Sequence, residues 1–287
     1  MGRAADSRYR VPFSGKVDLS TFPTAPPDGV GSKEDLRTEL AAIQVRMDEL
    51  HRKMYADDRH AMLVIFQAMD AAGKDGTIRA VFTGLDPAGM HVTAFKAPSA
   101  EELDHDFLWR HLRHLPERGR VGVFNRSWYE EVIVARVVPA VLANQKLTRR
   151  PNDLFEERYE SIRDLEKHLA RNGTTVVKFF LHVSAAEQRK RLLERLDEPA
   201  KNWKFEAGDL DMRDRWGKFE HAYELALQAT SRSHAPWYVV PADHKPFLRV
   251  AVAQIVLRVM EGMDLKWPEL DPAEAAALGA LRSRLRS

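Results

Sequence analysis

The hydrophobic and polar positions of this chain follow two alternating periods, and the alternation predicts an α/β fold. Short apolar runs typical of buried strands occupy residues 62–67, 91–95, 121–125, 174–183 and 237–240. Helical spacing predicts helices over residues 74–84, 100–114, 128–137, 152–171, 185–196, 211–229 and 246–262. Strands that alternate with helices form a mainly parallel sheet with helices on both faces. We therefore expect a five-stranded sheet in a three-layer fold.

Three segments differ in their pattern along the chain. Residues 1–31 contain four prolines and several glycines and are expected to form an irregular arm. A helix should begin at Ser32, because Asp35 three positions later completes a pattern like a capping box. Residues 32–265 are then expected to form one domain. Residues 266–287, which carry three arginines, should be a solvated and partly ordered tail.

The first predicted helix carries an apolar seam with alternating spacings of four and three. Its members are Leu36, Leu40, Ile43, Met47, Leu50 and Met54. The seam covers fewer than three heptads, which favours packing on its own domain over a free coiled coil. A contact between subunits is the alternative interpretation.

A phosphate-binding loop is predicted directly after the first strand. The apolar run from Met62 to Phe66 stops at Gln67, and small residues then lead to Gly73 and Lys74. A tight turn there would point backbone N–H groups, a helix N-terminus and the Lys74 ammonium at one anion. The residues expected to bind phosphate are Ala71, Ala72, Gly73, Lys74, Asp75, Gly76 and Thr77.

The loop departs from the usual pattern G-x-x-x-x-G-K-[ST] in ways that change the chemistry. Ala68 takes the first glycine position, and Asp75 replaces the hydroxyl residue that normally contacts magnesium. The loop also contains a carboxylate, Asp70, which bound phosphates would repel unless a divalent cation lay between them. Asp70 is therefore a candidate metal ligand. The alternative is that it only caps the turn or the following helix.

The third strand leads into a second group of polar residues. Asn125 stands where a related phosphotransferase would place an aspartate, and it can offer only a neutral oxygen. Arg126 could neutralise charge on a transferring phosphoryl group. The alternative for Arg126 is a structural ion pair with Glu130 four residues later. Trp128 and Tyr129 are expected to pack in the core.

A third group of candidates lies in residues 185–218, which resemble the lid of a nucleotide kinase. Cations on a hinged helix pair could close over phosphates and exclude water. The lid candidates are Arg191, Arg195, Lys201 and Lys204. An ordinary solvated helix with internal ion pairs is the alternative. Further candidates for substrate binding are Lys96 at the end of the second strand, Glu130 and Arg136.

Composition narrows the class of protein. Net charge is +2, so no overall field favours nucleic acid or membrane, and an anion site must arise from local clustering. The chain has no cysteine, which excludes disulfides and thiol chemistry. No apolar run approaches the roughly 18 residues needed to span a bilayer, and residues 1–13 lack the apolar stretch of a secretory signal. A cytoplasmic enzyme is expected.

Taken together, these stretches resemble the polyphosphate kinase 2 family from about Tyr9 to about Leu265. The motifs are MDAAGKDGTI (69–78), FKAPSAEELDHDFLWR (95–110), FNRSWYEEV (124–132), KFFLHVSAAEQRKRL (178–192), EPAKNWKF (198–205) and HAPWYVVPADHK (234–245). The resemblance implies a P-loop kinase-like fold with a helical lid. It also implies reversible, in-line phosphoryl transfer between inorganic polyphosphate and nucleotides, without a covalent intermediate and with Mg²⁺ or Mn²⁺.

Position by position, the resemblance assigns roles to the candidate residues. It implies that Asp70 and Lys74 bind the metal and the phosphates. It also implies that Asn125 and Arg126 orient the transferring phosphoryl group and that Arg191 closes over it. Many relatives have aspartate at position 125. Asparagine there, with Glu130, resembles the single-domain subgroup that converts AMP to ADP and ADP to ATP, although Trp128 stands where that subgroup often has histidine. Adenine and guanine nucleotides are the implied substrates, and a homodimer or homotetramer is the implied assembly.

Two other functions fit parts of the same pattern. An ATP-dependent nucleoside monophosphate kinase shares the loop, the sheet and the lid. A non-catalytic protein that binds polyanions or RNA could use the basic lid alone, and its binding would survive Lys74→Ala and need no magnesium.

Overall fold

The computed structural model describes residues 5–148, 153–204 and 208–286. Its centre is a five-stranded sheet in which every pair of neighbouring strands is parallel. The strands are β1 (Ala61–Ala68), β2 (Met90–Ala94), β3 (Val121–Asn125), β4 (Thr174–His182) and β5 (Trp237–Pro241), in the order β2-β3-β1-β4-β5. All five strands lie where the hydrophobic pattern predicts them, to within two residues at each end.

The order of the strands brings the predicted polar groups together. β1 is buried along its whole length, as expected for a strand with helices on both sides. It lies between β3 and β4, and the register sets Phe66 beside Asn125. The carboxyl ends of β1 and β3 are therefore neighbours at one edge of the sheet, where ligands bind in open α/β folds.

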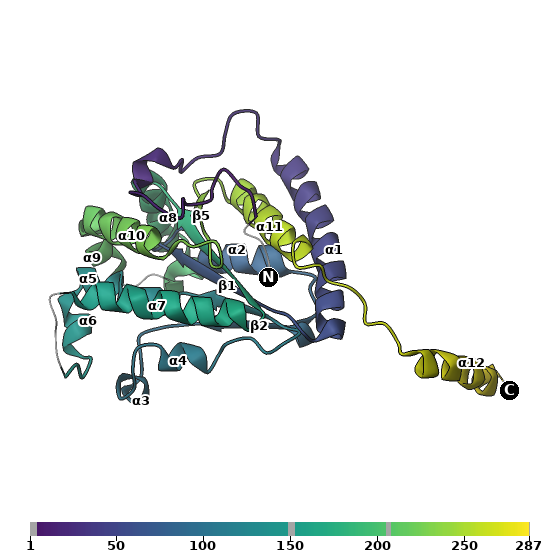
Figure 1. Ribbon diagram of the computed structural model, residues 1–287. Coiled ribbons are helices and arrows are strands. Elements are labelled where there is room, and N and C mark those ends of the chain that lie inside the picture. Colours follow the sequence, from purple (N-terminus) through teal and green to yellow (C-terminus); the bar gives the residue numbers. More distant parts are fainter. Residues whose placement is uncertain (1–4, 149–152, 205–207, 287) are drawn as a thin grey trace.

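Helices cover both faces of the sheet and produce the expected three layers (Figure 1). One layer contains α1 (Lys33–Asp57), α2 (Lys74–Phe82) and α11 (Lys245–Glu261). The other contains α5 (Val134–Val137), α7 (Leu154–Arg171) and α10 (Trp216–Thr230). The remaining helices of this body are α3 (Ala100–Leu103), α4 (Trp109–Leu112), α6 (Pro139–Ala143), α8 (Ala185–Asp197) and α9 (Gly208–Asp214). Short 3₁₀ helices span Leu19–Thr21, Pro87–Gly89, Trp128–Glu131 and Pro199–Lys204.

The first helix begins and packs as its sequence indicates. Ser32 and Asp35 form a reciprocal capping box, with hydrogen bonds of 3.2 and 2.8 Å. Five of the six seam residues are buried and Leu40 is partly buried, because the helix packs along α11. Packing on the domain is confirmed, so this seam is not available as a contact between subunits.

Three predicted helices are interrupted. The helix expected over 100–114 forms only α3 and α4, because the Asp106 carboxylate accepts the backbone N–H of Leu108 and competes with helical bonding. The helix expected over 128–137 is a 3₁₀ turn followed by α5. The helix expected over 211–229 is α9 followed by α10. The start expected for α7 at residue 152 lies outside the described residues.

The two ends of the chain behave differently from each other. Residues 9–11 run along the edge of β5, where Val11 N–H donates to Trp237 O at 2.9 Å and Val239 N–H donates to Tyr9 O at 2.8 Å. The arm has little regular structure, but Val11 and Leu19 are buried. The tail contains a helix that the sequence analysis does not predict, α12 (Pro272–Arg286), which projects away from the body (Figure 1).

A charged network lies inside the sheet. Lys178, in the middle of β4, is fully buried and donates to the Glu166 carboxylate at 2.5 Å, to the Tyr129 hydroxyl at 2.9 Å and to Thr230 O at 2.9 Å. Burial lowers the pKa of Lys178 to about 8 and raises the pKa of Glu166 above its usual value. The network joins β4, α7 and α10 to Tyr129, which directly precedes the site residue Glu130.

Candidate active site

The loop after β1 has the geometry of a phosphate-binding turn. Ala71 has φ of 59° and Gly73 has φ of 105°, so the chain reverses through left-handed backbone before α2 begins at Lys74. Such backbone is costly for alanine and easy for glycine. No side chain caps α2, and the N–H groups of its first turn therefore face the loop without a capping oxygen. This arrangement favours a bound anion.

Lys74 supplies the positive charge of the loop. Its ammonium donates to Ala68 O at 3.1 Å, which folds the side chain back over the turn. Burial, together with the neighbouring Arg126 guanidinium, lowers the pKa of Lys74 to about 8, against the opposing effect of Asp70 and nearby carboxylates. A bound phosphate would favour the protonated ammonium, so the site is prepared for an anion.

Arg126 bridges two carboxylates directly beside the loop. Its guanidinium donates to Asp70 Oδ1 at 2.8 Å and to Glu130 Oε2 at 3.0 Å. These carboxylates, Glu130 above all, raise the pKa of Arg126. Gln67, fully buried at the end of β1, holds Glu130 through a hydrogen bond of 3.0 Å. The ion pair with Glu130 expected in the alternative interpretation is present, and the same side chain also reaches the loop.

Asn125 also reaches across to the loop. Its side-chain amide donates to Asp75 Oδ1 at 2.6 Å, and the backbone N–H of Arg126 donates to Phe66 O at 3.0 Å. The structure thus brings together Asp70, Lys74, Asp75, Asn125, Arg126 and Glu130. They come from two stretches that lie 50 residues apart in the sequence, and the parallel pairing of β1 and β3 brings them together.

The donor set fits magnesium. Mg²⁺ is usually held by one or two carboxylates together with substrate phosphates rather than by a cage made of protein alone. Asp70 and Asp75 both present carboxylate oxygens at the loop. Within the described parts of the chain, no group of three or more acidic, histidine or cysteine side chains could hold a metal ion. The site therefore fits a metal that arrives with phosphate.

The first lid helix is attached to the loop from behind. Gln188 of α8 donates to Asp70 O at 3.1 Å. Arg191 is 4% exposed, and its guanidinium donates to four backbone carbonyls at distances of 2.6 to 3.2 Å. Those carbonyls belong to Ala71, Ala72, Ala242 and Asp243. In this state Arg191 supports the loop backbone, and its predicted contact with a transferring group stays a prediction.

The other lid cations lie further from the loop. Lys201 pairs with Glu198 at 2.7 Å on the 3₁₀ segment after α8. Arg195 is partly buried in the last turn of α8. Lys204 ends the 3₁₀ segment, and its side chain lies outside the described part of the structure. Their roles in substrate binding stay predictions.

Lys96 and Arg136 occupy different places. Lys96 is exposed just beyond β2, where the N–H of Phe95 donates to Asn125 O at 3.0 Å, so it lies at the same edge as the site. Arg136 instead stacks over the ring of Phe155 at 4.1 Å, on the α7 side of the molecule. The structure does not bring Arg136 to the loop.

Sequence reasoning missed residues that support the site through distant contacts. Gln67 and Gln188 hold Glu130 and the loop backbone, as described above. Tyr223 of α10 is 3% exposed and lies near Glu130, Arg126 and Asp70. Burial, together with the Glu130 and Asp70 carboxylates, raises the pKa of Tyr223 well above its usual value, while Arg126 acts in the opposite direction. Gln67 could have been found, because a glutamine that ends an apolar strand needs a partner. No sequence signal connects α10 to the loop.

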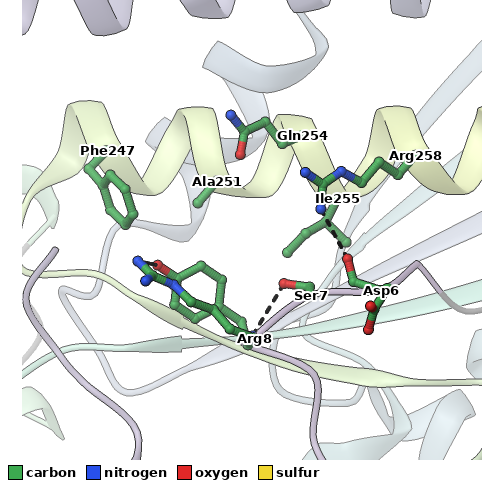
Figure 2. Close-up of a pocket in the computed structure, with 9 residues that line it drawn as sticks. Asp6, Ser7, Arg8, Phe247, Ala251, Gln254, Ile255 and Arg258 are labelled. Carbon is green, nitrogen blue, oxygen red and sulfur yellow. Dashed lines mark hydrogen bonds between the residues drawn. The ribbon is translucent and has the colours of Figure 1, made fainter. Parts of the chain in front are cut away.

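A cavity of about 620 Å³ lies elsewhere, between the arm and α11. Figure 2 shows Phe247, Ala251, Ile255 and Arg258 of α11 facing Asp6, Ser7 and Arg8 of the arm. Gln254 also lines the cavity, but its side-chain amide points away from the arm and donates to Glu39 of α1. No predicted site residue lines it, so this cavity is separate from the phosphate loop.

The fold and site define the class of protein: a parallel sheet with a phosphate loop after β1 and cations at the end of β3 is a P-loop phosphotransferase. The sequence model of the family polyphosphate kinase 2 matches residues 30–268, and the chain belongs to that family.

Several known proteins are similar to this chain in sequence or structure over nearly its full length. The chain is 50% identical to an ADP-polyphosphate phosphotransferase of Rhodopseudomonas palustris, with 97% of both chains covered. It is 42% identical to an AMP/ADP-polyphosphate phosphotransferase of Meiothermus ruber, with 93% of this chain and 97% of the relative covered. The crystal structure of polyphosphate kinase 2 from Arthrobacter aurescens matches with a TM-score of 0.86 at 39% identity, covering 98% of both chains.

In the described ranges, no helix combines the length and the apolar character required to cross a bilayer.

Proposed function

We propose that this enzyme moves phosphoryl groups between inorganic polyphosphate and nucleoside mono- and diphosphates, from AMP to ADP and from ADP to ATP, reversibly. The printed names of the two relatives above include these acceptors. Asn125 and Glu130, as in the dual-acceptor subgroup, support the use of both AMP and ADP. Adenine nucleotides are the first substrates to test and guanine nucleotides the second. Because such nucleotides are intracellular metabolites, the proposal includes a cytoplasmic location.

One observation carries the proposal: Arg126 spans 2.8 and 3.0 Å to two carboxylates beside a loop that holds Lys74. Phosphoryl transfer requires in-line positioning and neutralisation of charge more than acid–base chemistry. Lys74 and the N–H groups of α2 would hold the donor phosphates, and Arg126 would turn toward the transferring group. In-line transfer to a nucleotide phosphate oxygen needs no covalent intermediate.

We include Mg²⁺ as the cofactor, with Mn²⁺ as a substitute. Asp70, and Asp75 beside it, would hold the ion on the loop side. The ion would supply positive charge between the protein carboxylates and the phosphates. Release of Asp70 to a metal would free one arm of Arg126, because the two carboxylates share its guanidinium.

We also propose a homo-oligomer, either a dimer or a tetramer. The α1 seam is occupied within the domain, so it gives no support. The support comes from α12, where Leu278, Leu281 and Leu285 are 48%, 49% and 90% exposed at helical spacing. The mass of the protein in solution, measured by light scattering after size-exclusion chromatography, tests this part.

The decisive experiment supplies polyphosphate as the sole phosphoryl donor and measures ADP and ATP formed from AMP and ADP with Mg²⁺. We expect product from both acceptors, and a loss of turnover by about a hundredfold or more in Lys74→Ala and in Asp70→Ala. Melting temperatures of both variants serve as controls for folding. Turnover with ATP alone as donor would identify a nucleoside monophosphate kinase instead. Activity within tenfold of wild type would remove Lys74 or Asp70 from the catalytic set.

A further inference from the structure

A second cavity, of about 410 Å³, lies between the N-terminal arm, α7 and α10; we call it the α7–α10 cavity. Its volume is in the range typical of cavities that bind small organic molecules. Phe13, Glu156, Tyr159, Arg163 and Arg232 are among the residues that line it. None of its lining residues belongs to the phosphate loop or to the groups at the end of β3, so the cavity is separate from the candidate active site.

Two arginines give the cavity positive charge and have no acidic partner. Arg163 Nη1 donates to Ala229 O at 3.2 Å. Arg232 Nη1 donates to Ser231 O at 2.6 Å and to Phe13 O at 3.5 Å. Within the described parts of the chain, neither guanidinium forms an ion pair, and all of these bonds use Nη1. The N–H groups of Nε and Nη2 therefore have no acceptor among the described residues.

The two guanidinium groups lie close enough to repel each other. Burial and the neighbouring Arg163 lower the pKa of Arg232, although Tyr129 and Glu166 act in the opposite direction. An anion between two like charges removes their repulsion. A phosphate group would also accept charge-assisted hydrogen bonds from both guanidinium groups. The pair is thus arranged to bind a phosphate.

The cavity residues of α7 share one face of the helix. Glu156, Tyr159 and Arg163 are spaced by three and four residues, so their side chains follow one another along α7. Glu156 is exposed and, in the described ranges, forms no ion pair. It lies seven residues before Arg163, which is roughly 10 Å along a helix. Tyr159, between them, is 1% exposed, and its hydroxyl donates to no acceptor among the residues that the structure describes.

The order of these groups fits a nucleoside monophosphate better than a chain of phosphates. With its phosphate at the arginines, such a ligand would extend its nucleoside toward Glu156. That carboxylate can accept hydrogen bonds from ribose hydroxyls or from an amino group of the base. The half-buried ring of Phe13 offers an aromatic surface on which a base can stack. A chain of phosphates would instead bring negative charge against Glu156.

We propose that the α7–α10 cavity is a second nucleotide-binding site, at which Arg163 and Arg232 bind the phosphate of a nucleoside monophosphate and Glu156 binds its nucleoside. The site takes no part in phosphoryl transfer, because no lining residue belongs to the phosphate loop. A nucleotide there would connect the arm with α7 and α10, so it should stabilise the folded enzyme. The inference goes beyond the proposed function and does not depend on which donor the enzyme uses.

The test is the double variant Arg163→Gln/Arg232→Gln, titrated with AMP in a calorimeter without polyphosphate. We expect wild type to bind about two AMP molecules per chain and the variant about one, because the lost hydrogen bonds to phosphate are charge-assisted. With polyphosphate and AMP, kcat of the variant should stay within twofold of wild type.

A crystal soaked with 8-bromo-AMP, without Mg²⁺, locates the ligand. The anomalous signal of bromine should appear in the α7–α10 cavity of wild type and be absent from the cavity of the double variant. Equimolar inorganic phosphate or tripolyphosphate should leave this signal in place. Its loss on addition of either would overturn the assignment to a nucleotide.

The matched control is Lys167→Gln/Arg171→Gln, which removes two exposed charges from α7 outside the cavity and should leave the number of bound AMP molecules unchanged. Melting temperatures control for folding, and Arg163→Gln alone is the second variant if the double variant folds poorly. Equal numbers of bound AMP in wild type and in the cavity variants would overturn the site. A wild-type enzyme that binds AMP in the cavity but transfers no phosphate from polyphosphate would instead overturn the proposed function.

Discussion

Two residues with strained backbone frame the site. Ala71 and Arg126 have φ of 59° and 65°, a region that side-chain-bearing residues adopt only when surrounding contacts hold them. The N–H of Arg126 is fixed by Phe66 O, and Ala71 O accepts from Arg191 at 3.2 Å. From this backbone the Arg126 guanidinium donates to Asp70 Oδ1 at 2.8 Å. The unfavourable backbone conformation of these two residues is therefore maintained by surrounding contacts at the site where the Arg126 guanidinium is held.

The pKa of Lys74, about 8, predicts how catalysis responds to pH. Above pH 8 the free enzyme loses the ammonium charge, so kcat/KM for polyphosphate should fall about tenfold for each further pH unit. In Lys74→Arg the guanidinium stays charged over this range. The decrease in kcat/KM should therefore begin at a higher pH in this variant, even if its maximal kcat/KM is lower than that of wild type. Circular dichroism across the same range controls for unfolding. An alkaline limb that keeps its position in Lys74→Arg would show that another group titrates.

Asn125 gives a prediction about acceptors. Its amide donates to Asp75 at 2.6 Å, and an aspartate at 125 would set two carboxylates face to face. Asn125→Asp should therefore lower the Mg²⁺ concentration needed for half-maximal activity, because two adjacent carboxylates attract the cation more strongly than one. It should also change the ratio of kcat/KM for AMP and ADP by at least threefold. An unaltered ratio would mean that another residue selects the acceptor.

Some contacts of the site could be predicted from the sequence, and others could not. Asp70, Lys74, Asn125 and Arg126 could be predicted to meet, because parallel strands end at one edge of a sheet and each group follows a strand directly. Arg191 was found as a cation near the loop, but not as the donor to four carbonyls. A sequence shows charge, and only tertiary packing decides whether charge faces solvent, ligand or backbone.

At the scale of elements, α8 acts as a brace. Gln188 and Arg191 attach it to the phosphate loop, and Asp243 accepts the N–H of Ser184 at 2.7 Å at the start of the helix. Any closing motion of the lid is therefore expected in the segments after α8. The helical period of 185–196 predicted the element correctly, because a strong N-cap and an amphipathic pattern are local signals.

The brace predicts a loss of stability as well as of activity. Arg191→Ala would leave three buried carbonyls and the partly buried carbonyl of Asp243 without their donor, which should cost about 2–4 kcal/mol of the free energy of unfolding. kcat should fall because the loop backbone at Ala71 and Ala72 loses its support. Arg189→Ala is the control, since Arg189 is exposed on the same helix. Lower kcat with unchanged urea unfolding would argue instead for direct contact of Arg191 with substrate.

Elements without strong local signals were predicted less well. The short helices α3 and α4 were predicted as one, because spacing alone does not show that the Asp106 carboxylate takes a backbone N–H. The tail helix α12 was missed because three arginines suggested a solvated end, whereas its alanines and leucines have high helical propensity.

At the scale of the whole molecule, the N-terminal arm completes the sheet. Arg10 forms an antiparallel bridge with Tyr238, so the outer edge of β5 is covered instead of open. Thr24 O accepts the N–H of Asp243, whose own carbonyl binds Arg191 at 3.2 Å. Hydrogen bonds at Asp243, just after β5, therefore link the arm to Arg191, which holds the backbone of the phosphate loop.

Deletion of residues 1–22 should destabilise the enzyme and promote aggregation. It removes the buried side chains of Val11, Val17 and Leu19, worth roughly 5 kcal/mol together, and it exposes the N–H and C=O groups of β5. Light scattering and thermal unfolding measure both effects. Deletion of residues 270–287 is the comparison: α12 projects from the body, so its loss should remove the proposed contact between subunits and lower the mass of the particle without exposing β5 or causing aggregation. If the variant without the arm melted like wild type and stayed monodisperse, the arm would be an appendage rather than part of the core.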